Sequence, residues 1–155
     1  ERQNRMDNLF KEAYDFIRLG REDEGLAKAR LFLQKNPTVW NAWFLTGWAL
    51  RRLTKWDEAR IAFERALELG AEGTDVRNEL SICLLELGRV GEARRELEKA
   101  LNEEPENVKI ITNLGAIALR QGRPDEAACF FRTALEIESG DLAATRWLAE
   151  VEASG

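Results

Sequence analysis

Histidine is absent from this chain of 155 residues. Its absence removes the side chain that proteins use most often as a general base and as a metal ligand near neutral pH. The two cysteines, Cys83 and Cys129, are too few for a zinc site of the usual spacing. The glycines are spread along the chain, so no glycine-rich phosphate loop is present. We therefore predict no catalytic residue, no metal site and no cofactor, and expect that the protein is not an enzyme.

Other features are scarce as well. No apolar run approaches the roughly 18 residues of a membrane span, and no signal-peptide pattern is present. Two cysteines do not make a disulfide framework, which fits a reducing cytoplasm. The net charge of −5 argues against binding to nucleic acids or to anionic membranes. We expect a cytoplasmic protein that binds neither.

The sequence does contain a repeat of 34 residues. The segment 56–70 recurs twice, so that Glu58-Ala59 aligns with Glu92-Ala93 and with Glu126-Ala127. A second set of positions has the same spacing and consists mostly of glycine: Gly20, Thr54, Gly88 and Gly122. Glycine ends helices by adopting a positive φ at little cost, and Thr54 departs from this pattern, so it should be strained there if its φ is positive. A fixed period of this length indicates an array of similar structural units.

Between these turns the apolar residues recur at helical spacing. In the second unit, Trp43, Gly47 and Leu50 follow one helical stripe, and Ala59 and Phe63 begin another. Each unit is therefore predicted to be an antiparallel pair of helices, A and B, with small residues at their close approach. Acidic pairs that resemble hydrolase carboxylates recur at the ends of the B helices, where the helix dipole explains them: Asp57-Glu58, Glu103-Glu104 and Asp125-Glu126. Cys83 is predicted to face the core.

Units two to four resemble tetratricopeptide repeats, whose pattern of small and large residues they share at Trp43, Gly47, Ala59, Phe63, Ala66; Leu80, Ala93, Leu97, Ala100, Pro105; Leu114, Gly115, Ala127, Phe131 and Ala134. The first unit is a degenerate copy. The resemblance implies an all-α solenoid of antiparallel helix pairs in a right-handed superhelix, in which the A helices line a concave groove that binds a peptide or protein segment.

The predicted organisation is a single domain over residues 1–155. It contains repeats at 6–39, 40–73, 74–107 and 108–141, and a capping helix at 142–153. Asp141 is the predicted N-cap of that last helix. Leu142, Leu148 and Ala149 continue the pattern of the A helices, and Trp147 is expected to pack on the fourth repeat.

Helix A of the second repeat has a second stripe, formed by Phe44, Trp48 and Arg51, that its docking on helix B does not require. Aromatic residues and arginine are enriched in binding hot spots. The same offset in the other repeats completes the predicted ligand-binding groove: Phe10, Tyr14, Arg18, Phe44, Trp48, Arg51, Arg52, Asn78, Ile82, Thr112 and Arg120. A peptide with an acidic residue or a C-terminal carboxylate would suit the arginines.

We thus expect a protein–protein interaction module whose partner the sequence does not identify. The alternative is a structural or self-assembly arm of a larger protein, in which another domain or a second copy, as in a homodimer, covers the aromatic residues. Packing between neighbouring A helices is a further interpretation of Phe44 and Trp48.

Overall fold

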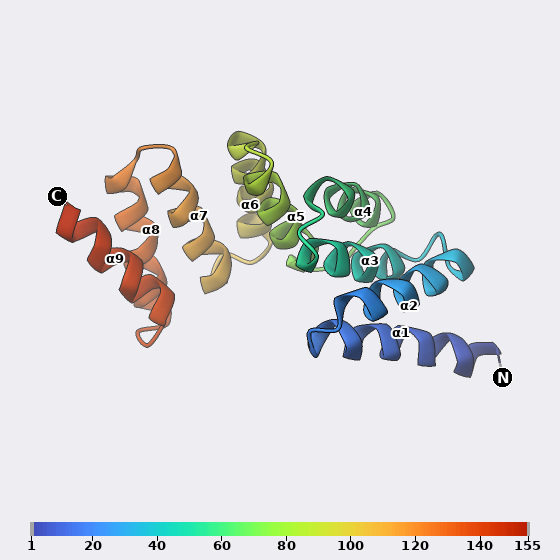
Figure 1. Cartoon of the computed structure of the whole chain (residues 1–155). Coiled ribbons are helices and arrows are strands. Elements are labelled where there is room, and N and C mark those ends of the chain that lie inside the picture. Colours follow the sequence, from blue (N-terminus) through green and yellow to red (C-terminus); the bar gives the residue numbers. More distant parts are fainter. Residues whose placement is uncertain (1, 155) are drawn as a thin grey trace. The chain divides into compact units, whose positions relative to one another are not determined.

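The computed structural model describes the backbone of residues 2–154 and the side chains of residues 8–154. Glu1 and Gly155, the two ends of the predicted domain, lie outside the described residues. All regular structure in this range is helical (Figure 1). The nine described helices are α1 (Arg2–Arg18), α2 (Glu22–Lys35), α3 (Trp40–Arg52), α4 (Trp56–Glu68), α5 (Asp75–Glu86), α6 (Val90–Glu103), α7 (Val108–Arg120), α8 (Pro124–Ile137) and α9 (Leu142–Ser154).

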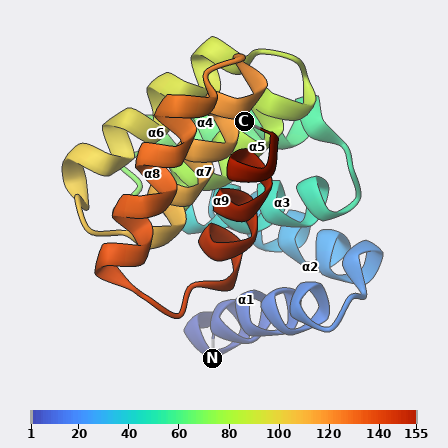
Figure 2. The same cartoon turned by 90° about the vertical axis from the view of Figure 1, so that its left-hand side faces the viewer.

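Consecutive helices from α1 to α5, and again from α6 to α9, pack against each other, as the helix-pair pattern predicts. The helices α1 and α2, α3 and α4, and α7 and α8 form pairs joined by short turns, and α9 packs on α8 (Figure 2). The helices α1 to α5 form one compact unit and α6 to α9 form a second, with the division between Gly88 and Arg89. Within the first unit the A helices also contact one another, α1 with α3 and α3 with α5.

The turns within repeats have the predicted backbone geometry. Gly20, Gly88 and Gly122 have φ angles of +82°, +78° and +75°. Thr54 occupies the equivalent place with φ +59°, and it is the one residue other than glycine with positive φ in the described chain. The next residue, Lys55, donates its N–H to the carbonyl of Leu50 at 2.9 Å, which is the hydrogen bond characteristic of a Schellman motif. The turn geometry is therefore retained at Thr54 despite its β-carbon.

Close helix contacts depend on glycine facing phenylalanine. A β-carbon at Gly47 would lie 2.8 Å from the ring of Phe63, and one at Gly115 would lie 2.4 Å from the ring of Phe131. Both rings are completely buried. In the first repeat the glycine of the close contact lies on the second helix of the pair. Gly25 of α2 leaves room for the side chain of Ile17 on α1. This exchange explains why Ile17 is buried, although its sequence column also contains the groove residue Arg51.

The last helix begins as predicted, and its packing departs from the prediction at two residues. The Asp141 carboxylate accepts a hydrogen bond from the N–H of Ala144 at 2.8 Å, which caps α9. Trp147 stacks on Phe131, with ring centres 6.3 Å apart and planes 11° apart. The predictions for Leu142 and Ala149 are wrong, because Leu142 is 83% exposed and Ala149 is exposed as well, and Ala144 points into the core instead.

Candidate partner-binding surface

Two aromatic residues from neighbouring A helices meet at the surface of the first unit. The ring centres of Tyr14 on α1 and Trp48 on α3 are 5.4 Å apart, with the planes tilted by 45°. Tyr14 remains 44% exposed and Trp48 is half-buried. The contact is packing between repeats, as one interpretation of the sequence holds, but it leaves part of both rings in solvent.

The exposed rings continue along α3. Trp40, Phe44 and Trp48 follow one another at intervals of four residues, and all three are partly buried. The Trp40 and Phe44 rings pack edge to face with centres 6.3 Å apart, and Phe44 also reaches Phe63 of α4 at 6.0 Å. We call Tyr14, Trp40, Phe44 and Trp48 the aromatic surface.

Trp40 is absent from the predicted groove residues, although the sequence contained a signal for it. It precedes Phe44 by four residues and therefore lies on the same helical stripe. Phe10, which was predicted, is partly buried because its ring packs edge to face against Phe32 of α2, with centres 5.5 Å apart. Phe10 therefore covers the core of the first repeat.

The predicted arginines of α3 are engaged by carboxylates of neighbouring helices. Arg51 forms an ion pair with Glu79 of α5, and Arg52 pairs with Glu22 of α2 at 3.1 Å. A hydrogen bond from its own backbone N–H, followed by the contact with Arg52, lowers the pKa of Glu22. Both arginines thus connect α3 to other helices, and a ligand would meet them already paired.

Arg52 also lies beside the aromatic surface. Its guanidinium carbon is 6.0 Å from the centre of the Trp48 ring, which is within the range of a cation–π contact. Arg18, near the end of α1, is more exposed, and its closest carboxylate oxygen on Asp15 is 3.9 Å away. These positions place guanidinium groups at the edge of the aromatic surface.

The remaining predicted residues are dispersed. Asn78 and Thr112 are buried, with 3% and 8% of their surface exposed, and the Thr112 hydroxyl donates to the carbonyl of Val108 at 2.8 Å. Ile82 is partly buried on α5, and Arg120 is exposed at the end of α7 in the second unit. Asn78 and Thr112 therefore present almost no surface to a ligand.

The repeat pattern matches known family models along most of the chain. Models of the tetratricopeptide repeat match residues 10–74, 50–116 and 84–136. The chain belongs to the tetratricopeptide repeat family. This result confirms the predicted family and the all-α solenoid of helix pairs, and membership of the family supports a protein–protein interaction module.

Solved tetratricopeptide repeat structures have the same fold. YrrB, described as having an unusual peptide-binding site, is 21% identical over 94% of this chain and 75% of its own, with a TM-score of 0.77. Pseudomonas aeruginosa pilF is 19% identical over 99% of this chain and 70% of its own, with a TM-score of 0.87. The Cut9–Hcn1 hetero-tetramer of the APC/C is 14% identical over 92% of this chain and 29% of its own, with a TM-score of 0.86. No curated protein sequence matches the chain.

The described part of this tetratricopeptide repeat protein shows no group of acidic, cysteine or histidine residues able to hold a metal ion. Cys83 is fully buried, as predicted, and burial raises the pKa of its thiol to about 12. Cys129 is exposed on α8. Among the described helices, none has both the length and the apolar character to cross a bilayer.

Two of the three acidic pairs lie where the helix dipole favours them. Asp57-Glu58 and Asp125-Glu126 occupy the first turns of α4 and α8. The third prediction is wrong, because Glu103-Glu104 lies at the end of α6. There the Glu104 carboxylate accepts a hydrogen bond from the Asn107 amide at 2.7 Å.

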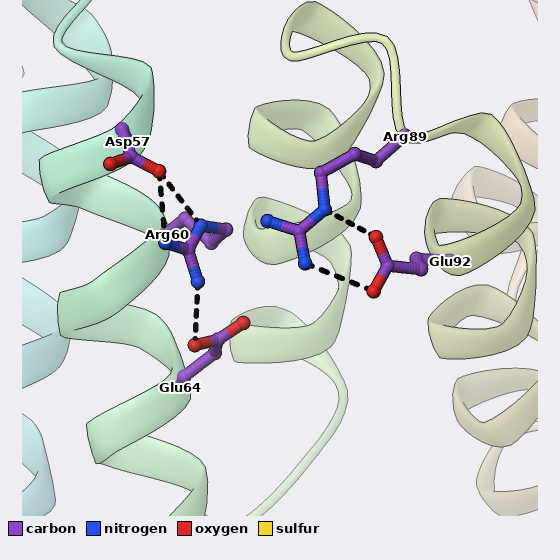
Figure 3. A network of polar contacts seen from close by, with 5 residues as sticks. All are labelled: Asp57, Arg60, Glu64, Arg89 and Glu92. Atoms are coloured by element: carbon purple, nitrogen blue, oxygen red, sulfur yellow. Dashed lines mark hydrogen bonds and ion pairs between the residues drawn. The ribbon is translucent and has the colours of Figure 1, made fainter.

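Arginines pair with Asp57 and with other carboxylates on the helix surfaces. Figure 3 shows Arg60 between Asp57 and Glu64, with N–O distances of 2.9 Å to each. It also shows two guanidinium nitrogens of Arg89 donating hydrogen bonds to the two carboxylate oxygens of Glu92. Hydrogen bonds to Asp57 and then to Glu64 raise the pKa of Arg60. Carboxylates held in this way stabilise helices and are poorly suited to general acid–base catalysis.

Proposed function

We propose that this protein is a non-enzymatic module that binds a protein or peptide segment on the aromatic surface of its first unit. The observation that supports this most directly is the Tyr14–Trp48 pair, in which Tyr14 is exposed and Trp48 is half-buried. Burial of one fully exposed large apolar side chain contributes on the order of 1.5–3 kcal/mol, and completing the burial of a partly exposed ring contributes a proportionate share of that. Several partly exposed rings on adjacent helices therefore provide enough apolar area for a specific interface.

Packing within the chain does not use all of this area. Phe63 and Phe131, which fill the helix pairs, are completely buried, whereas Tyr14 is 44% exposed. The net charge of −5 and the paired arginines of α3 favour a protein ligand over nucleic acid or a membrane surface. The unpaired cysteines fit the reducing cytoplasm as the place of this binding.

The test compares partner capture by the wild-type protein and by a Trp48→Ala variant. Partners are captured from an extract of the source cells and quantified by mass spectrometry. We expect Trp48→Ala to lower the recovery of the specific partner by about tenfold or more, as removal of a hot-spot residue does. The control is Leu31→Ala, which truncates an apolar side chain of α2 that is 45% exposed and lies outside the aromatic surface.

Circular dichroism must show that both variants remain folded. Equal recovery of every partner by wild type and Trp48→Ala would contradict the proposal. Light scattering tests the alternative that the surface serves self-assembly. A stable dimer that dissociates on Trp48→Ala would assign the surface to contact with a second copy.

A further inference from the structure

We draw no further inference here: the strongest candidate, the aromatic surface that Tyr14 of α1 forms with Trp40, Phe44 and Trp48 of α3, belongs to the site already described, and nothing in the structure shows what covers it.

Discussion

Thr54 places a β-branched side chain at a turn whose positive φ strains the backbone of any residue other than glycine. Its backbone has φ +59°, in the left-handed region, where a β-branched side chain is crowded. Gly20, Gly88 and Gly122 occupy the same place in the other repeats without a side chain. The turn between α3 and α4 is therefore formed by a residue that disfavours it, and the surrounding helix packing must hold it.

Thr54→Gly should stabilise the protein. The relief of the left-handed backbone is expected to raise the free energy of unfolding by a few tenths to about 1 kcal/mol. Urea unfolding measures this as a higher midpoint with an unchanged slope. The reverse change, Gly88→Thr, should lower the midpoint, because Gly88 has φ +78° and open space around it, so that only the backbone contributes. A lower midpoint for Thr54→Gly would contradict this account.

At the residue scale the sequence predicted conformation better than charge pairing. The burial of Cys83 and the cap at Asp141 follow from local rules and are confirmed, and Thr54 has the positive φ on which its predicted cost depends. The pairing of Arg51 with Glu79 and of Arg52 with Glu22 was not predicted. A column of equivalent positions gives the direction of a side chain but not which carboxylate of a neighbouring helix lies within its reach.

At the scale of the element, the pairs α3–α4 and α7–α8 depend on glycine facing a phenylalanine ring. The ring of Phe131 is completely buried, lies against Gly115 and stacks on Trp147. The ring therefore connects three helices, α7, α8 and α9. A larger side chain at Gly115 should therefore disturb the packing of all three helices.

Gly115→Ala is expected to destabilise the protein by about 1–3 kcal/mol, because the new β-carbon would lie 2.4 Å from the Phe131 ring. Urea unfolding gives the free energy, and the matched control is Gly91→Ala. A β-carbon at Gly91 of α6 would lie 3.6 Å from the nearest atom, on the Arg95 side chain, so alanine there should be neutral or stabilising by up to about 1 kcal/mol.

A double variant tests the mechanism. If the ring clash is the cause, Phe131→Leu should cost less in the Gly115→Ala background than in the wild type. Strictly additive effects would show that the two side chains do not interact and would sink this explanation.

The order of the helices was predictable because the 34-residue period appears directly in the sequence. The exchange of positions in the first repeat was not, since Gly25 and Ile17 each depart from the repeat pattern and only together restore a close contact. A pattern read one column at a time misses such compensating changes. The exposure of Leu142 was missed for a related reason, because no following helix B packs on α9 within the described residues.

At the scale of the whole molecule, the absence of histidine and the paired carboxylates determine the pH response. No side chain has an ordinary pKa between about 6 and 8, so stability should be nearly constant across that range. At lower pH, carboxylates that are held by arginines become the relevant groups. Glu126 is one of them, because a hydrogen bond from Arg94 at 2.7 Å lowers its pKa.

A lowered pKa means that the folded state binds this proton less readily than the unfolded state does. The contribution of Glu126 is therefore fully present above the unfolded pKa of about 4.3 and is lost as the pH falls through the folded value. Urea unfolding between about pH 7 and pH 3 should show a smaller loss of stability for Glu126→Gln than for wild type. An identical loss in both proteins would exclude the Arg94–Glu126 pair as a source of acid sensitivity.

The repeat period predicted the family and the fold class, whereas the proposed function depends on residues outside the period. Within the aromatic surface, Tyr14 and Trp48 share a column whose other members are Ile82 and Ala116. Such positions vary freely between repeats because the helix packing does not constrain them. For this reason the sequence located the surface approximately and left its chemistry to the structure.

Tyr14 is the one tyrosine in the chain, and its ring touches the indole of Trp48. At that separation an excited tyrosine passes its energy to tryptophan before it can emit. Tyrosine fluorescence from this protein would therefore indicate molecules in which α1 has separated from α3. Intrinsic fluorescence can therefore measure whether the contact between the first two repeats is formed, without an added label.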